Sequence, residues 1–256
     1  MAGQVPKPTP EFTFTFTTDP SVSPFTVPYQ KYIANQATRS GIPDYEYVAV
    51  GALVFCHFPT PTDTVSTVDT IVDTDAAADH HGNGTQSLRV LLVQRAAHDS
   101  APLRWEAPGG ACDPEDASIL HAVARELWEE AGLVARRIGP LVAPGHVFVT
   151  RGGKRVCKFE FLVDVAGGRV NDVEDDDGRP KDRGKDGDGK GGGISPSIPQ
   201  VKLDPNEHVN YVWATEEECR EGRTIAGNIE LAFTTRQQKA TLLEAFKVWR
   251  GLDGMN

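Results

Sequence analysis

Long apolar runs and one glycine-rich turn indicate the strands of the chain. Residues 47–58 and 88–95 are almost continuously apolar over the length of a strand, which is typical of strands buried on both faces. Residues 146–150 and 155–165 flank the segment Arg151-Gly152-Gly153-Lys154. A glycine-rich turn between two such runs predicts a β-hairpin.

Helical periodicity appears in two other places. Residues 119–131 and 236–249 repeat apolar positions with the spacing of a helix face, and a short strand is expected over 209–214. The alternation of Phe12, Phe14 and Phe16 predicts an edge strand near the start of the chain. Strands and helices that alternate in this way indicate an α/β fold class.

Two polar tracts interrupt this pattern, at about 59–87 and about 167–200. Both are rich in Asp and Gly and carry few large apolar side chains, so they cannot offset the entropy of ordering. We expect them to be disordered surface insertions between strands of one domain. The paired His80 and His81 fall in the first tract, where a solvated position is expected.

Composition narrows the classes of function. The 256 residues carry a formal net charge of −10, which disfavours binding to a nucleic-acid backbone. No run of apolar residues is long enough for a membrane span, and the first residues do not resemble a secretory signal. The four cysteines are far apart in sequence, which favours reduced thiols and a cytoplasmic location, with the nucleus as the alternative.

The segment that carries chemistry is the helix expected over 119–131. On a helical wheel, Glu126, Glu129 and Glu130 converge beside the apolar stripe. Crowded like charges destabilise an isolated helix, but oxygen ligands at this spacing suit a hard divalent cation. The alternative is a solvated acidic face. Gly132 is expected to end the helix as its C-cap residue.

The surrounding residues resemble a known signature. The segment R-E-L-W-E-E-A-G-L, at 125–133, is similar to the second half of the Nudix box, G-x5-E-x7-R-E-U-x-E-E-x-G-U, where U is aliphatic. The first half departs from it, because Ala111 and Ala117 occupy the glycine and acid positions counted back from Arg125. The loop between the glycine turn and the helix therefore carries one extra residue. Either Glu115 or Asp116 takes the place of the missing acid, or the site has no acid at this position. The layout is also similar to that of Nudix proteins of fungi.

The resemblance implies a fold, a reaction and a cation site. It implies a Nudix-type α/β/α sandwich around a mixed sheet over residues 45–250, preceded by an N-terminal extension over 1–44. The implied activity is the hydrolysis of a pyrophosphate bond in a nucleoside diphosphate linked to another moiety. Mg²⁺ or Mn²⁺ would be held by three glutamates and one backbone carbonyl, those of Glu126, Glu129, Glu130 and Gly109. Glu126 and Glu130 would act in catalysis, and Arg125 would orient the glutamates.

Several other residues are weaker candidates. Arg95 and Glu106 could contact substrate, and Glu207 could act as an extra ligand or base, whereas His208 is expected at the surface. A binding module without turnover is the alternative function, and an isomerase of the isopentenyl type is a remote one because no cysteine is placed to act as its acid. The sequence leaves the linked moiety and the oligomeric state open.

Overall fold

The computed structural model describes residues 13–41, 43–59, 86–166 and 198–253. Its helical elements are η1 (Pro20–Phe25), α1 (Tyr29–Ser40), α2 (Ile119–Ala131), α3 (Glu216–Glu221) and α4 (Arg236–Asp253). Its strands are β1 (Thr17–Thr18), β2 (Tyr47–Pro59), β3 (Gln86–Arg95), β4 (Trp105–Glu106), β5 (Ala135–Leu141), β6 (His146–Val149), β7 (Arg155–Val165) and β8 (His208–Thr215). Strands β2, β3, β6, β7 and β8 and helices α2 and α4 confirm the elements expected from the apolar pattern.

The strands form one mixed sheet in the order β1-β5-β7-β2-β3-β4, with β6 paired to β7 and β8 paired to β3. The central strand β2 is parallel to β7 and antiparallel to β3. The hairpin expected around Gly152 and Gly153 is present as β6 and β7. A mixed sheet with helices confirms the expected α/β class.

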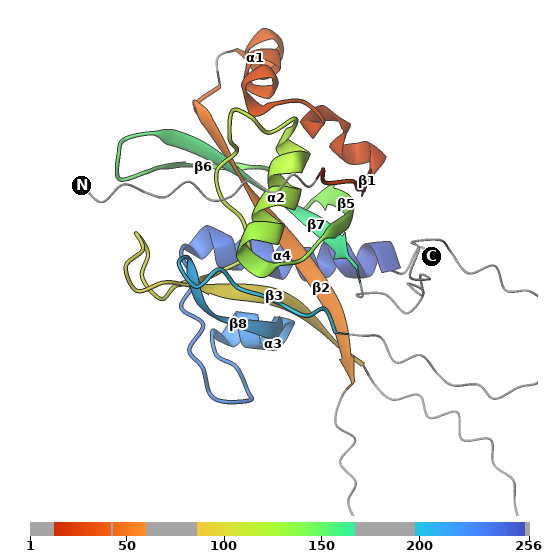
Figure 1. Ribbon diagram of the computed structural model, residues 1–256, viewed down its shortest axis with the longest axis vertical. Helices are drawn as coiled ribbons and strands as arrows, with labels where there is room; N and C mark the ends of the chain where they lie inside the picture. Colours follow the sequence, from red (N-terminus) through yellow and green to blue (C-terminus); the bar gives the residue numbers. More distant parts are fainter. Residues whose placement is uncertain (1–12, 42, 60–85, 167–197, 254–256) are drawn as a thin grey trace, which may run out of the picture.

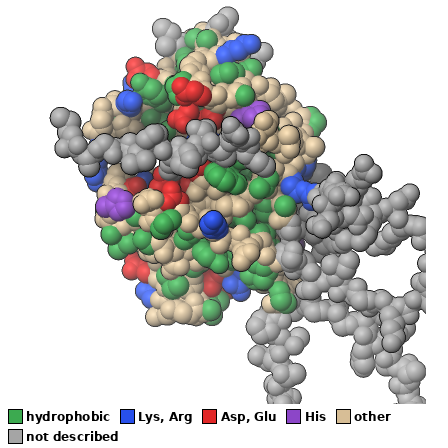
Figure 2. Space-filling view, in the orientation of Figure 1, with side chains coloured by type: hydrophobic (Ala, Val, Ile, Leu, Met, Phe, Trp, Pro, Cys, Tyr) green, Lys and Arg blue, Asp and Glu red, His purple; other side chains and the backbone are tan. Residues whose placement is uncertain are grey.

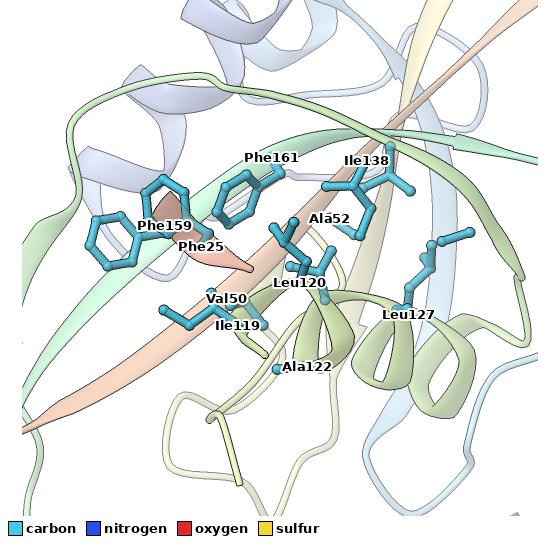
Figure 3. Close-up of a cluster of buried hydrophobic side chains, with 14 of the residues drawn as sticks. Phe25, Val50, Ala52, Ile119, Leu120, Ala122, Leu127, Ile138, Phe159 and Phe161 are labelled. Carbon is cyan, nitrogen blue, oxygen red and sulfur yellow. The ribbon is translucent and has the colours of Figure 1, made fainter. Parts of the chain in front are cut away.

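Helices cover both faces of this sheet (Figure 1). Helix α2 covers one face, where its apolar stripe packs on β2, β5 and β7, as Leu120, Leu127, Val50 and Phe161 show in Figure 3. Helices α3 and α4 cover the other face, where Cys219 and Phe246 pack with Leu53 and Leu92. The result is the three-layered sandwich that was expected.

Helix α2 has the bounds that its periodicity predicts. The side chain of Ser118 caps its first turn by accepting a hydrogen bond from the His121 amide. Gly132 ends it in the left-handed region, with φ 67°, and its amide donates to the Trp128 carbonyl. Strong signals at both ends therefore fix the register of the residues on this helix.

The segment that holds β1, η1 and α1 packs against the same core. Phe25, at the end of η1, is buried against Tyr32 of α1 and against Phe159 and Phe161 of β7. The pairing of β1 with β5 adds this segment to the edge of the sheet. Residues 17–40 are thus part of the packed structure around the sheet.

The edge strand expected from the phenylalanine alternation is wrong in position. The strand begins only at Thr17, and Phe12 lies outside the described residues. Phe14 packs against Trp128 and Phe16 against His121, both on α2. Phe14 and Phe16 therefore cover the helix, and Thr17 and Thr18, which follow them, pair with the sheet.

Three other expectations can be placed. The two insertions lie, except for their ends, outside the described residues, as do His80 and His81. All four cysteines are buried and unpaired. None of the helices in the described part of the chain combines the length and apolar character that a membrane span needs.

Candidate active site

The glycine turn that precedes α2 is bonded to the central strand of the sheet. The amides of Val50 and Ala52 donate to the carbonyls of Gly110 and Pro108, each at 2.8 Å. Gly109, between Pro108 and Gly110, has a φ of 152°. A Cβ on Gly109 would lie 2.2 Å from the Val50 carbonyl oxygen. Only glycine fits such a close approach, so the sequence of the turn fixes its path.

This turn lies directly against the carboxylates of α2. The Gly109 amide donates to Glu130 Oε2 at 2.6 Å. A Cβ on Gly110 would lie 2.6 Å from Glu126 Oε2, so the absent side chain leaves the space that this carboxylate fills. The structure thus brings together Gly109, Glu126 and Glu130, which the sequence predicted as one site.

The three predicted acids differ in burial. Glu126 and Glu130 are only 8% and 6% exposed, whereas Glu129 is partly buried. Acidic side chains also reach the surface on the face of the molecule that α2 covers (Figure 2). Buried carboxylates need a partner of opposite charge, which makes a plain solvated face a poor description of Glu126 and Glu130.

Arg125 is the cation that contacts these acids. It donates to Glu126 at 2.8 Å and to Glu129 at 3.1 Å, and it also donates to both oxygens of Asp116 at 3.0 and 2.9 Å. Glu115 is exposed. Of the two acids that the loop offers in place of the one missing at Ala117, Asp116 is therefore the one that binds Arg125.

Burial raises the pKa values of the two inner carboxyls. The pKa of Glu126 rises to about 7, although Arg125 opposes the rise. The pKa of Glu130 lies well above its ordinary range, because burial is reinforced by Glu126 and Glu106 and only partly offset by the Gly109 amide. The negative charge gathered here thus exceeds what the neighbouring protein groups neutralise.

Arg95 and Glu106 lie next to each other on adjacent strands. The Arg95 guanidinium pairs with Glu106 and, at 2.6 Å, with Asp99. Lys158 Nζ is 3.9 Å from the other oxygen of Glu106. Glu106 is buried, and its charge acts on Glu130, so this ion-paired group borders the carboxylates of α2.

Glu207 and His208 also reach this site. One ligand atom each from Glu130, Glu207 and His208 lies within 4.8 Å of the others. The expectation that His208 lies at the surface is wrong, because the residue is 3% exposed. Burial lowers the pKa of its imidazole. The start of β8 therefore contributes to the site, which the short apolar pattern of that strand did not reveal.

Comparisons with known proteins agree with the signature. Residues 80–180 match the family model of the NUDIX domain. An RNA pyrophosphohydrolase of Psychrobacter sp. (strain PRwf-1) is 39% identical over 70 residues, which are 27% of this chain and 38% of that protein. The chain thus spans less than half the length of this curated relative.

Similar solved structures include three bacterial or archaeal proteins. The MutT protein from Methanosarcina mazei Go1 is 18% identical, with 81% of this chain and 98% of that chain covered, at a TM-score of 0.44. A mutT/nudix family protein from Listeria innocua is 18% identical, with 84% and 100% covered, at 0.43. The NUDIX domain of Shewanella oneidensis NrtR complexed with ADP ribose is 15% identical, with 84% and 97% covered, at 0.43.

The family model and the segment 125–133 identify the same part of the chain. That segment forms most of α2, the helix whose acids meet the glycine turn. Residues 80–180, which include α2 and its signature segment, are therefore similar to the NUDIX domain.

Proposed function

We propose that the protein hydrolyses a pyrophosphate bond in a nucleoside diphosphate linked to another moiety, with the help of Mg²⁺ or Mn²⁺. The observation that carries the proposal is the burial of Glu126 and Glu130 against a glycine turn bonded to the sheet. A fold gains no stability by crowding buried acids in this way, so a ligand of positive charge accounts for them best.

The donor atoms suit a hard divalent cation. Carboxylate oxygens and backbone carbonyls are the ligands that Mg²⁺ and Mn²⁺ prefer. Glu126, Glu129, Glu130 and the Gly109 carbonyl would hold the cation. When bound, the cation would neutralise charge on the pyrophosphate and lower the pKa of a water molecule.

The remaining roles fall to the groups around these acids. Arg125 orients Glu126 and Glu129 through its hydrogen bonds, and it is itself held by Asp116. A carboxylate of Glu126 or Glu130 would accept the proton of the attacking water. Arg95 at the end of β3 and Glu106 of β4 are the proposed substrate contacts. Glu207 is the proposed extra ligand or base. The four unpaired cysteines support a reducing location such as the cytoplasm or the nucleus.

The test is a panel of substrates with and without Mg²⁺. It would include nucleoside triphosphates, nucleotide sugars, dinucleotides, coenzyme A and ADP-ribose. The name of the Psychrobacter relative, an RNA pyrophosphohydrolase, adds RNA to this panel. We expect turnover of at least one nucleotide in Mg²⁺ and none in excess chelator, with the products identified by mass.

The matched variants are Glu129→Gln and Glu244→Gln. Glu129 is a proposed ligand, whereas Glu244 is a surface acid of α4 paired with Lys247. Glu129→Gln should lower turnover by about 100-fold or more, and Glu244→Gln should leave it unchanged. Tight nucleotide binding without any turnover would favour the binding-module alternative and contradict the proposal.

A further inference from the structure

The ammonium group of Lys158, on β7, is largely buried and makes no hydrogen bond to any residue that the structure describes. The side chain is only 11% exposed. Glu106 Oε2 lies 3.9 Å from its Nζ atom, which is an ion-pair distance but too long for a hydrogen bond. The other oxygen of Glu106 is paired with Arg95. Buried donors are normally hydrogen-bonded, so Lys158 has the capacity to bind an acceptor from a ligand.

The sequence of β2 makes room for this lysine. Lys158 pairs with Ala49 of β2, and Gly51 follows two residues later on the same face of the sheet. A Cβ on Gly51 would lie 3.3 Å from Lys158 Cε. Glycine weakens the interior of a strand, and its presence there often marks a close approach. The missing side chain at Gly51 therefore lets Lys158 extend across β2.

The ammonium group lies close to the acids of α2. Glu106 contacts Lys158 Nζ, and its charge also helps to raise the pKa of Glu130. Glu130 is one of the ligands proposed for the divalent cation. Lysine binds phosphate as a mobile point charge. A phosphate next to that cation would supply the acceptors that Lys158 lacks.

Two rings continue the same face onto the neighbouring strand β6. His146 pairs directly with Lys158, and Phe148 follows two residues later on that face. The ring centroids of His146 and Phe148 are 5.8 Å apart, and their planes are inclined by 34°. Phe148 is 37% exposed. Histidine and phenylalanine rings stack with nucleobases, so β6 offers a surface for a base beside Lys158.

The imidazole of His146 is in its neutral form near pH 7. Burial lowers its pKa, Glu160 opposes this effect, and the charge of Lys158 adds to it. A neutral ring can stack on a base without the need to keep a positive charge hydrated. The effect of Lys158 also shows that its ammonium group and the imidazole are near each other.

The hairpin of β6 and β7 projects from the sheet but is attached to the loop after β3 (Figure 1). Arg151, in the turn of the hairpin, donates to the Ser100 carbonyl at 2.6 Å. In the same loop, Asp99 pairs with Arg95 at the end of β3. These contacts hold the turn of the hairpin near the strand end that carries Arg95.

We propose that this face of the hairpin binds the nucleoside monophosphate half of the substrate. Lys158 Nζ donates to the phosphate, and the rings of His146 and Phe148 stack with the base. The other moiety of the substrate then points away from the hairpin. The inference rests on the proposed function, because it takes a nucleoside diphosphate derivative as the substrate.

The test is a nuclear magnetic resonance titration of the isotope-labelled full chain in excess chelator. The ligands are AMP, GMP and ribose 5-phosphate, and the method measures even weak binding. We expect shifts of amide signals on β6 and β7 with all three ligands. AMP or GMP should bind about tenfold more tightly than ribose 5-phosphate, because only the nucleotides carry a base that can stack.

Three variants assign these contributions. Lys158→Gln should weaken the binding of all three ligands about tenfold or more, because it removes a charge-assisted bond to phosphate. Phe148→Ala should weaken only AMP and GMP, by about tenfold. Lys154→Gln is the matched control on the same hairpin, where Lys154 Nζ lies over the Tyr47 ring at 4.6 Å. It should leave all three affinities unchanged.

The outcomes separate this inference from the proposed function. Shifts confined to other parts of the protein, equal affinity for all three ligands, or unchanged binding in Lys158→Gln would overturn the inference. The proposed function would still stand if Mg²⁺ supported turnover. Shifts on the hairpin without any turnover in Mg²⁺ would overturn the proposed function alone. Because the wild-type spectra locate the ligand, the test holds even if a variant does not fold.

Discussion

At the scale of single residues, Asp116 connects the loop before α2 to the acids of that helix through Arg125. It accepts two hydrogen bonds from Arg125, and both side chains are largely buried. Burial by itself would lower the pKa of Arg125, but the hydrogen bonds with Asp116 and the charge of Glu126 raise it. Asp116 thus holds in place the guanidinium that contacts Glu126 and Glu129.

This contact gives a matched pair of variants. Asp116→Asn removes a charge-assisted bond of a buried guanidinium, so it should lower the free energy of unfolding by about 1–3 kcal/mol. Glu115→Gln changes the neighbouring exposed acid and should cost less than about 0.5 kcal/mol. Urea unfolding of the metal-free proteins measures both values. If both variants lost the same free energy of unfolding, the prediction would be contradicted, because the loss would not then come from the contact between Asp116 and Arg125.

At the scale of elements, α2 combines a core-packing face with two buried acids. Its apolar stripe lies in the core under the sheet, while Glu126 and Glu130 lie against the glycine turn. The pKa of Glu126 is raised to about 7 by burial. The same helix therefore stabilises the fold through its stripe and destabilises it through its ionised carboxylates.

The second prediction is a dependence of stability on pH. Between about pH 4.5 and 7 the folded protein binds a proton at Glu126 that the unfolded chain has lost, so the stability of the metal-free protein should fall as pH rises through this range. Glu126→Gln should make the fall shallower, because the proton is no longer exchanged. Melting temperatures at a series of pH values measure the slope.

Two controls accompany this measurement. Glu244→Gln, which changes a surface acid, should leave the slope as it is in the wild-type protein. Mg²⁺ should raise the melting temperature more at pH 8 than at pH 5, since the ligands must be deprotonated to bind it. An identical slope in the wild-type protein and Glu126→Gln would contradict the assignment.

At the scale of the whole molecule, the segment that holds η1 and α1 completes the layer that α2 begins. Phe25 contacts Tyr32, Phe159 and Phe161 at centroid distances of 5.0, 5.1 and 5.1 Å. Its neighbours Val22 and Tyr29 are also buried in this core. The core on this face of the sheet therefore depends on a segment far from it in sequence (Figure 1).

The third prediction tests this packing. Phe25→Ala should lower the free energy of unfolding by about 3–5 kcal/mol, because it leaves a cavity among aromatic rings. Phe148→Ala, on the exposed strand β6, should cost less than about 1 kcal/mol. Chemical denaturation compares the two. A small effect of Phe25→Ala would show that the segment contributes little to folding.

The sequence predicts those parts of the fold in which one local pattern is strong. Helix α2 has a clear period and two caps, β2 is an almost unbroken apolar run, and a glycine-rich turn marks the hairpin of β6 and β7. Helix α1 and strand β5 were missed, because α1 is mostly polar and β5 contains Arg136, Gly139 and Pro140. The buried residues of α1 and β5 pack against strands that are distant in sequence. A local sequence pattern carries no information about such contacts.

The same reasoning applies to the site. The helical period placed Glu126 and Glu130 together, and the resemblance to the Nudix box implied that Gly109 lies with them. The positions of Asp116 and His208 depend on one extra loop residue and on the bulge at Val209. No pattern of residues in the sequence marks the extra loop residue or the bulge clearly enough to predict where the nearby side chains point.

The burial of all four cysteines has a practical consequence for handling the protein. Burial raises the pKa of Cys157 to about 11 and that of Cys219 to about 12, and it also raises those of Cys56 and Cys112. Thiolate is the reactive form, so a folded molecule offers little to alkylating dyes or to oxidants. Each thiol becomes accessible only when the chain opens. The rate of labelling by a maleimide dye therefore reports opening of the native molecule, with no engineered tag.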